Sequence, residues 1–172
     1  MNMKSIKYFI LALSLITLLT LESCSYSFTG ASVPAHLQTV AIPTFDDRSG
    51  SGEPILGEKL TTELTNKFIT DNSLQITNKT DADAIVEGKI ERLSDTPEAI
   101  DGGETISLRK ITIRVKVLYK DLVKRQNIFD KSFTSYATYN NETDYITARQ
   151  SAIDEAIEQI AEDILLAVVS NW

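Results

Sequence analysis

The sequence contains very few of the residues that most often bind metals or carry out nucleophilic chemistry. Its 172 residues include one cysteine, Cys24, and one histidine, His36. A single cysteine excludes an internal disulfide framework and a cysteine-rich metal site. Any histidine-dependent catalytic arrangement must use His36, which lies close to Pro34 at the entrance to an expected strand and has no carboxylate motif beside it in sequence. We therefore interpret His36 as a surface or packing residue and do not expect an enzyme.

Positive charge is also scarce. The chain has 17 Lys and Arg residues against 24 Asp and Glu residues, which gives a formal net charge of -7. Proteins that bind nucleic acid usually have a positive balance and a basic stripe, so nucleic acid is not an expected partner. Hydrophobic residues make up 42% of the chain and charged residues 24%, a composition typical of one ordinary globular domain.

Loops that bind phosphate or metal ions are missing from the sequence. Gly102–Gly103 is an isolated pair rather than part of a phosphate-binding motif. Asp46–Asp47 opens a polar segment that ends at Gly52, but the ligand spacing of an EF-hand is absent. We interpret this segment as a solvated loop, and Asp81 and Asp83 as solvated carboxylates. The sequence predicts no metal site and no cofactor.

The N-terminus carries the longest apolar run, from Tyr8 to Leu21, which follows Lys4 and Lys7. Positive charge followed by an apolar stretch is typical of an export signal, and this run is shorter than the roughly 20 residues that span a bilayer. The run leads into Leu21-Glu22-Ser23-Cys24, which resembles the lipobox of bacterial lipoproteins. We expect a signal peptide over residues 1–23, acylation of Cys24 as a membrane anchor, a tether over 24–36 and one domain over 37–172.

The predicted domain is of the α+β class. Leu56, Leu60, Leu64 and Phe68 recur every four residues and predict an amphipathic helix that ends at Asp71–Asn72. The same periodicity predicts a helix over Asp144–Val169, and Ser94–Thr105 is expected to form a loop. Period-two alternation predicts strands at Leu37–Ile42, Leu74–Thr77, Ala84–Leu93, Ile106–Lys120 and Ile128–Tyr139, of which the last two form a hairpin. The order β-α-β-β-β-β-α predicts a single mostly antiparallel or mixed sheet with both helices packed on one face.

A basic ladder follows one side of the strongest predicted strand. Its members alternate with apolar residues that point the other way: Lys110, Arg114, Lys116 and Lys120. One interpretation is cross-strand pairing with Glu87 and Glu91, which would add modestly to stability. The other is a surface for an anionic partner, such as the phosphorylated sugar of a lipid. The sequence leaves both open.

Short stretches spread over nearly the entire mature chain resemble one protein family. They are Tyr26–Ser32, Ala82–Ala84 with Glu87–Ile90, Thr96–Pro97 with Ala99–Ile100, Leu108 with Ile111–Ile113 and Val115–Val117, Ser132–Phe133 with Tyr136–Ala137, and Val168–Trp172. Their ordered set is similar to the LptE family of lipopolysaccharide-assembly lipoproteins, in the branch found in Bacteroidetes. The resemblance implies an outer-membrane lipoprotein that plugs the β-barrel protein LptD, assists barrel assembly and takes part in delivering lipopolysaccharide to the outer leaflet.

Two other functions remain open at the level of sequence. A curli-type secretion-pore lipoprotein also joins a lipobox to an α/β domain, and the hairpin over residues 106–139 has the alternation that a pore strand needs. An envelope hydrolase would have to use His36 or the loop carboxylates. The pore predicts that the hairpin faces lipid, whereas the plug predicts that the hairpin packs against the helices. The sequence does not indicate which leaflet holds the anchor.

Overall fold

The computed structural model describes residues 33–98, 108–140 and 144–170. The chain divides into two compact units, Met1–Gly30 and Ala31–Trp172, and the described residues all belong to the second. The predicted signal peptide, the predicted lipidation site Cys24, the pair Gly102–Gly103 and most of the predicted loop Ser94–Thr105 lie outside the described residues.

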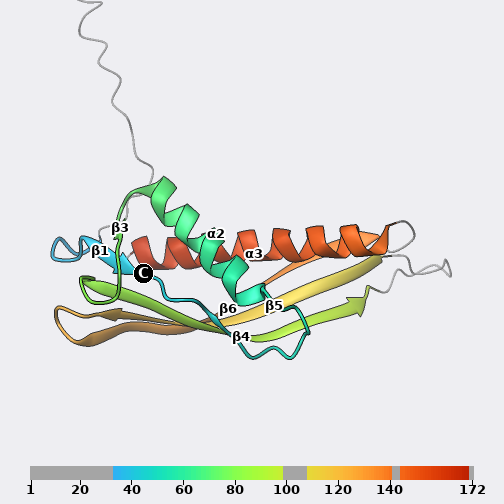
Figure 1. Cartoon of the computed structure of the whole chain (residues 1–172), viewed down its shortest axis with the longest axis horizontal. Coiled ribbons are helices and arrows are strands. Elements are labelled where there is room, and N and C mark those ends of the chain that lie inside the picture. Colours follow the sequence, from blue (N-terminus) through green and yellow to red (C-terminus); the bar gives the residue numbers. More distant parts are fainter. Residues whose placement is uncertain (1–32, 99–107, 141–143, 171–172) are drawn as a thin grey trace, which may run out of the picture. The chain divides into compact units, whose positions relative to one another are not determined.

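The described residues fold around one mixed sheet, shown in Figure 1. Its strands are β1 (Thr39–Ala41), β2 (Asp46–Asp47), β3 (Gln75–Ile76), β4 (Ala84–Pro97), β5 (Leu108–Asp121) and β6 (Gln126–Asn140). The strand order is β3-β1-β4-β5-β6, with β2 paired to β4 off this path. The short strands pair in parallel, whereas β4, β5 and β6 form a long antiparallel meander. The predicted hairpin is confirmed.

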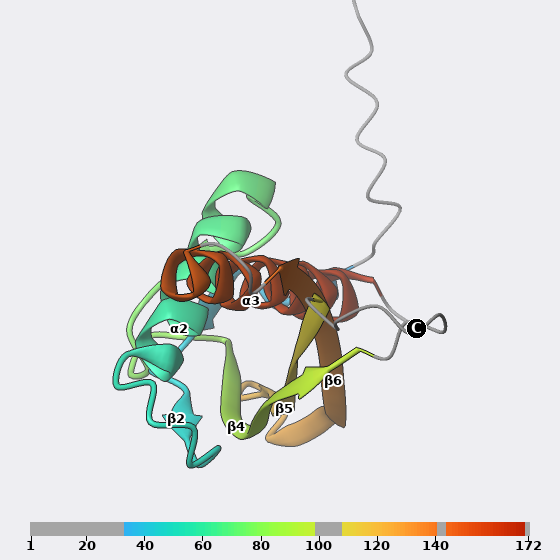
Figure 2. The same cartoon turned by 90° about the vertical axis from the view of Figure 1, so that its right-hand side faces the viewer.

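Two helices cover one face of this sheet. Helix α2 spans Leu56–Asp71 and helix α3 spans Tyr145–Val169. Figure 2 shows both helices on the same side of the long strands, with α3 lying along β5 and β6 and α2 resting against α3. The opposite face of β4, β5 and β6 has no helix on it among the described elements. The predicted α+β class, mixed sheet and one-sided helical layer are therefore confirmed.

The core forms where the apolar stripes of the helices meet the inner face of the sheet. On β5 the inner residues Ile111, Ile113, Val115 and Val117 are all buried, as period-two alternation requires. The helices supply the facing residues, among them Leu60, Leu64, Phe68, Ile153, Ile157, Ile160 and Ile164, all buried. Every apolar position named for the α2 stripe is thus in the core.

Gly88 occupies an inner position on β4 because the Phe45 ring takes the space of a side chain there. A Cβ atom built on Gly88 would lie 2.1 Å from a ring carbon of Phe45, far inside van der Waals contact. Phe45 is itself buried, with 2% of its surface exposed. The absence of a side chain at Gly88 therefore lets the segment between β1 and α2 pack directly on the sheet.

Two loop predictions were wrong. Asp46–Asp47 is not part of a loop but forms β2, which pairs in parallel with Lys89 and Ile90 of β4. Only backbone groups are needed for that pairing, so two exposed carboxylates can occupy a strand. Strand β4 continues to Pro97 rather than ending at Leu93, because Ser94–Pro97 pair with β5. Cross-strand pairing with a long neighbour overrides the low strand propensity of these residues.

The helix ends follow the sequence signals. The side chain of Asp144 accepts a hydrogen bond from the Thr147 amide at the start of α3, as expected of an N-cap residue. Asn72 ends α2 in a left-handed conformation, with a φ of 57°, and returns its N–H to the Phe68 carbonyl. Among the described residues, no helix has both the length and the apolar content to cross a membrane.

Candidate functional site

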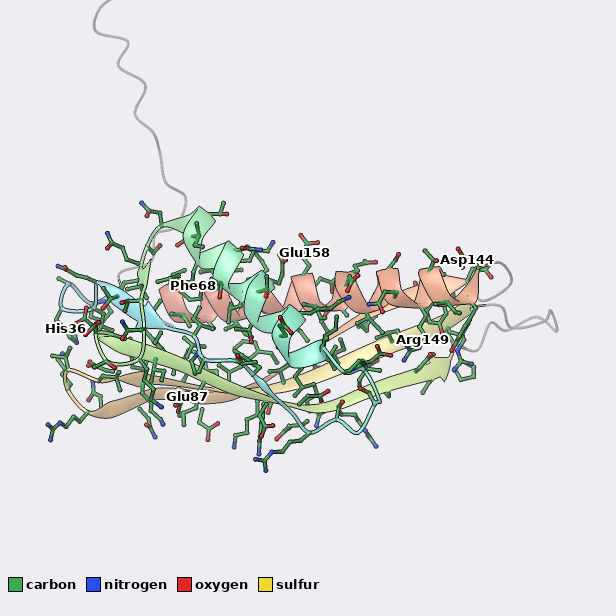
Figure 3. The ribbon with its side chains drawn as sticks, viewed as in Figure 1. His36, Phe68, Glu87, Asp144, Arg149 and Glu158 are labelled. Atoms are coloured by element: carbon green, nitrogen blue, oxygen red, sulfur yellow. The ribbon has the colours of Figure 1, made fainter. Side chains whose placement is uncertain are left out.

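The uncovered face of the sheet carries mostly polar and charged side chains, with Leu118 and the buried Ile85 as apolar exceptions. It consists of the outward positions of β4, β5 and β6, which include Glu87, Lys89, Arg92, Lys110, Thr112, Arg114, Lys116, Lys120, Asp130 and Thr134. Figure 3 shows Glu87 on this side of the sheet and Glu158 on the far side of the helical layer. We call this surface the outer sheet face.

A β-bulge determines which residues of β4 reach this face. Up to Ile90, the even-numbered residues of β4 point into the core, and continued alternation would send Arg92 there too. The register with β5 shifts between Ile90 and Arg92, and one extra residue in a strand reverses the facing of those that follow. Arg92 is therefore exposed, while Leu93 packs against the core.

Two pairs of like charges lie directly opposite each other across β4 and β5, and the bulge produces the second of them. Lys89 pairs in register with Lys116, and Arg92 with Arg114. Opposite residues in an antiparallel pair have Cα atoms about 4.5–5.5 Å apart, and like charges at such positions destabilise a sheet. We call Lys89, Arg92, Arg114 and Lys116 the cationic quartet. It is the least self-neutralised part of the outer sheet face, since Arg92 and Arg114 have no acidic partner among the described residues.

The remaining members of the predicted basic ladder are paired to carboxylates. Lys120 donates to Glu87 at 2.7 Å, and Lys110 donates to Glu98. The hydrogen bond from Lys120 is the main reason that the pKa of Glu87 lies below its ordinary value. The structure thus divides the ladder. Lys120 pairs with Glu87, as the pairing interpretation expects, and Lys110 pairs with Glu98, a partner which that interpretation did not name. Arg114 has no acidic partner among the described residues.

Lys116 and Lys89 are intermediate cases. The Lys116 ammonium lies 3.2 Å from Asp130 on β6, and the Lys89 ammonium lies 3.8 Å from Glu91. Glu91 therefore pairs within β4 rather than with the ladder on β5. Lys89 and Lys116 line a hollow of about 370 Å³ together with Glu87, Leu118 and Asp130 among others.

Sequence reasoning missed Arg92 and Lys89 as partners of the ladder. Alternation places Lys89 on the outer face, but nothing in a single sequence gives the register that sets it opposite Lys116. Arg92 could not be placed by alternation at all, because the bulge reverses its facing. A polar-charged run at Glu91–Arg92, where an apolar residue would continue the pattern of Ile90, is the one local signal of an irregularity.

The single histidine has a structural partner from a distant part of the chain. His36 Nε2 lies 2.7 Å from the Asp121 carboxylate at the end of β5, and the other carboxylate oxygen accepts the Lys124 amide. Burial alone would raise the pKa of Asp121, but these hydrogen bonds outweigh it and hold the pKa below its ordinary value. Asp121 thereby joins the start of the domain to the turn between β5 and β6.

A cavity of about 240 Å³ lies beside this pair, lined by Tyr119, Phe129 and Val168 among others. The Tyr119 hydroxyl is buried and has no hydrogen-bond partner among the described residues. Burial, with the negative charge of Asp121, raises the pKa of Tyr119 to about 12. The hydroxyl is therefore a neutral group under physiological conditions.

A second polar cluster connects the other ends of the long strands to α3. Asp95 accepts hydrogen bonds from Arg109 at 2.8 Å, Tyr139 at 2.8 Å and Arg149 at 3.1 Å, and Arg149 also pairs with Glu53 at 2.6 Å. Burial opposes ionisation of Asp95, but its three donors outweigh burial and keep its pKa below the ordinary value. Figure 3 shows Arg149 at the opposite end of the domain from His36.

The acidic pairs considered as loop carboxylates have local structural roles. Asp83 accepts hydrogen bonds from the Gln38 and Thr39 amides. Asp46 pairs with Arg48 at 2.6 Å, and Asp47 accepts the Ser49 amide. Within the described ranges, no group of three or more His, Cys, Asp or Glu side chains is arranged to hold a metal ion.

Comparison with known proteins gives one family match. The family model described as LptE, lipopolysaccharide-assembly, matches residues 37–168, which is nearly the whole of the predicted domain. No curated protein matches the sequence significantly.

Several solved structures share the fold at low sequence identity. The hypothetical protein CT253 from Chlamydia trachomatis superposes with a TM-score of 0.57 at 12% identity, covering 77% of this chain and 95% of its own. A PelC dodecamer subunit from Paraburkholderia phytofirmans gives 0.52 at 12% identity, covering 83% and 94%. A putative lipoprotein from Caulobacter crescentus gives 0.52 at 14% identity, covering 76% and 87%. These likenesses, all at 12–14% identity, show the fold alone.

Proposed function

The chain belongs to the LptE family of lipopolysaccharide-assembly proteins, and from this premise we propose that it is a lipoprotein of the outer membrane that works inside another protein. In this proposal Cys24 carries the lipid anchor. The domain occupies the lumen of the β-barrel protein LptD, assists its assembly and takes part in inserting lipopolysaccharide into the outer leaflet. The role is one of binding and scaffolding rather than catalysis.

The observation that carries the proposal is the outer sheet face. All the apolar inner residues of β5 are covered by the helical layer. Most outward residues of β4, β5 and β6 are charged or carry hydroxyl groups, and the outward apolar residues Leu118 and Ile85 are half-buried and buried. The lumen of a transmembrane barrel is polar and water-filled. A domain with a broad polar face can occupy such a lumen without exposing a large apolar surface to the water in it.

The cationic quartet makes the outer sheet face favour a negatively charged ligand. Arg92 and Arg114 repel each other across the strand pair, so the arrangement contributes nothing to folding by itself. An anionic group between the two guanidinium groups would relieve that repulsion and accept several charge-assisted hydrogen bonds. We propose that the quartet contacts phosphate groups of lipopolysaccharide or carboxylates of the barrel wall, with Lys110 and Lys120 at its margins.

The packing of the hairpin supports the plug over the secretion pore. A pore strand needs an apolar face toward lipid and a polar face toward water. In β5 and β6 the apolar face is occupied by α3 instead, with Val115, Val117 and Ala137 buried beneath it. Exposing that face to lipid would require the helical layer to detach from the sheet.

The hydrolase alternative would have to use His36, and its surroundings favour a structural role. Its ring is held by Asp121, which also organises the turn after β5. The pair joins two distant segments of the chain, and this structural role accounts for it without any catalytic function. The acidic pairs that could act as catalytic carboxylates are likewise used in strand and loop hydrogen bonds.

Affinity purification from detergent-extracted native membranes tests the proposal directly. We expect a β-barrel protein to co-purify with the lipidated chain, and depletion of the chain to leave lipopolysaccharide in the periplasm or inner membrane. A Cys24→Ala variant is the matched control for anchoring, and it should lose labelling by a fatty-acid probe. Recovery of the lipidated chain without any barrel protein, or normal surface lipopolysaccharide after depletion, would contradict the proposal.

A further inference from the structure

The turn that joins β5 to β6, together with the start of β6, combines exposed aliphatic side chains with cations. Val123 is 55% exposed and Ile128 is 40% exposed. Lys124 and Arg125 lie between them in sequence, and Lys131 follows, all three exposed. We call these five residues the hairpin tip.

The positive charge of the hairpin tip is not neutralised within the domain. None of its three cations has an ion-pair partner in the described part of the chain. The Lys131 ammonium instead lies 5.3 Å from the centroid of the Phe129 ring. Asp121, at the start of the turn, is buried and already accepts from His36 and the Lys124 amide, and Asp130, next to Lys131, pairs with Lys116. A partner for this tip must supply negative charge at its surface and apolar volume behind that surface.

The position of the tip relative to the start of the domain narrows the choice of partner. The His36–Asp121 contact of 2.7 Å holds the segment before β1 against the end of β5. Figure 1 accordingly shows β1 and the hairpin turn at the same end of the domain. About a dozen residues separate Cys24 from His36 in sequence, and a fully extended chain of that length spans at most about 40 Å. A lipid anchor at Cys24 would keep His36, and with it the end of β5 that leads into the hairpin tip, within reach of the bilayer.

We propose that the hairpin tip is a second membrane contact, on the same leaflet as the lipid anchor. Val123 and Ile128 enter the interface between headgroups and acyl chains, while Lys124, Arg125 and Lys131 bind the phosphate groups of anionic phospholipids. The inference rests on the lipidation of Cys24 proposed above. The acyl chains hold the protein at the membrane, and the tip orients the domain on the bilayer before the domain enters the barrel lumen.

The expected strength follows from the number of cations. A Lys or Arg near an anionic membrane surface strengthens binding by about fivefold, so three of them favour an anionic over a neutral surface by about 100-fold. This contribution falls steeply with added salt. The aliphatic residues add a contribution that does not depend on salt, so some tip contact should persist at high ionic strength.

A fluorophore attached to the tip tests this contact in the full lipidated chain. The sequence has one cysteine, Cys24, whose thiol is consumed by lipidation, so a Val123→Cys variant offers one free thiol for an environment-sensitive dye. The purified protein is reconstituted into vesicles of phosphatidylcholine, with or without phosphatidylglycerol. Thr96→Cys is the matched control, because Thr96 is exposed and lies at the far end of β4 from the hairpin tip.

We expect a blue shift at position 123 in vesicles that contain phosphatidylglycerol, a much smaller shift in neutral vesicles and none at position 96. A Lys124→Glu/Arg125→Glu variant should lose the lipid-dependent shift. An unshifted dye at position 123 in a chain that mass spectrometry shows to be lipidated would overturn the inference. So would protection of the dye by a co-purified barrel protein instead of by lipid. If mass spectrometry shows that Cys24 is not lipidated, the proposed anchor is refuted, and this result is distinct from the behaviour of the dye.

Discussion

The two faces of the long meander follow different rules although they belong to the same three strands. On β5, Ile113 is buried under the helices while Arg114, the next residue, is exposed opposite Arg92. On the inner face the residues are apolar, and their side chains are buried by close packing against the helices. The outer sheet face is organised by charge, and it includes two pairs of like charges that a stable sheet does not need.

This difference separates what stabilises the protein from what it presents to a partner. Apolar burial contributes about 25 cal/mol per Å² of surface removed from water, so the inner face supplies the folding free energy. Exposed ion pairs contribute only about 0–1 kcal/mol each, so the outer sheet face can change charge at little cost to folding. Substitutions on the two faces should therefore have separable effects.

The largest effect is expected from truncating the inner face. Ile113→Ala should lower the free energy of unfolding by about 2–5 kcal/mol, because it removes buried methyl and methylene groups and leaves a cavity. Its neighbour Arg114→Ala is the matched control, and it should change stability by no more than about 0.5 kcal/mol. Urea unfolding followed by circular dichroism measures both, and equal losses in the two variants would refute the contrast between the faces.

The next effect concerns the polar cluster at the end of the inner face. Asp95→Asn should destabilise the domain by about 2–3 kcal/mol near neutral pH, because Arg109 and Arg149 lose a charged acceptor. A carboxyl with a lowered pKa stabilises the fold above its unfolded pKa, and this stabilisation is lost as pH falls through the folded pKa. The Asn variant should therefore show a shallower loss of stability below about pH 4, measured by urea unfolding across that range. If both proteins lost stability equally steeply below about pH 4, Asp95 would not contribute to the pH dependence of stability.

A smaller loss of stability is expected from adding a side chain at Gly88. Gly88→Ala should cost about 1–3 kcal/mol, because the new methyl group must displace the Phe45 ring from the sheet. Combining it with Phe45→Leu should recover part of the loss, since a smaller side chain at position 45 makes room. Thermal unfolding of both single variants and the double variant measures this coupling. Strict additivity would mean that the two residues do not compete for space.

The smallest effect on stability is expected where the effect on binding is greatest. Arg92→Glu replaces a like-charge pair with an opposite-charge pair facing Arg114, and should stabilise the domain by about 0.2–1 kcal/mol. The same change should weaken binding of lipopolysaccharide or of the barrel protein at low salt. Arg48→Glu, which makes the same charge change at a position 69% exposed, is the control. Undiminished binding by the Arg92 variant would remove the cationic quartet from the proposed interface.

Much of the fold could be predicted from the sequence because its periodicities are clean. The stripe Leu56, Leu60, Leu64 and Phe68 is entirely buried, and the alternation from Ile111 to Tyr119 continues without a break. The predictions failed where pairing partners decide the structure. Strand β2 exists because β4 lies beside it, and β4 extends to Pro97 because β5 is long enough to pair with it.

The candidate site was less accessible to the same reasoning. Alternation alone put Lys110, Arg114, Lys116 and Lys120 on one side of a strand, and the structure keeps them there. Whether each is neutralised depends on neighbours that local sequence does not specify. Glu87 and Glu98 reach two of them from β4 and the residue just beyond it, whereas the bulge brings Arg92 rather than a carboxylate opposite Arg114.

The sequence by itself determined the class of fold, the face of each helix and the sidedness of β5, because these follow from periods of 3.6 and 2 that a single segment carries. Only the tertiary structure decided which charges on the outer sheet face are paired and which remain open, and that His36 is joined to Asp121. The physical reason is that an ion pair depends on strand register and on contacts between segments far apart in the chain, and one inserted residue at a bulge is enough to change both.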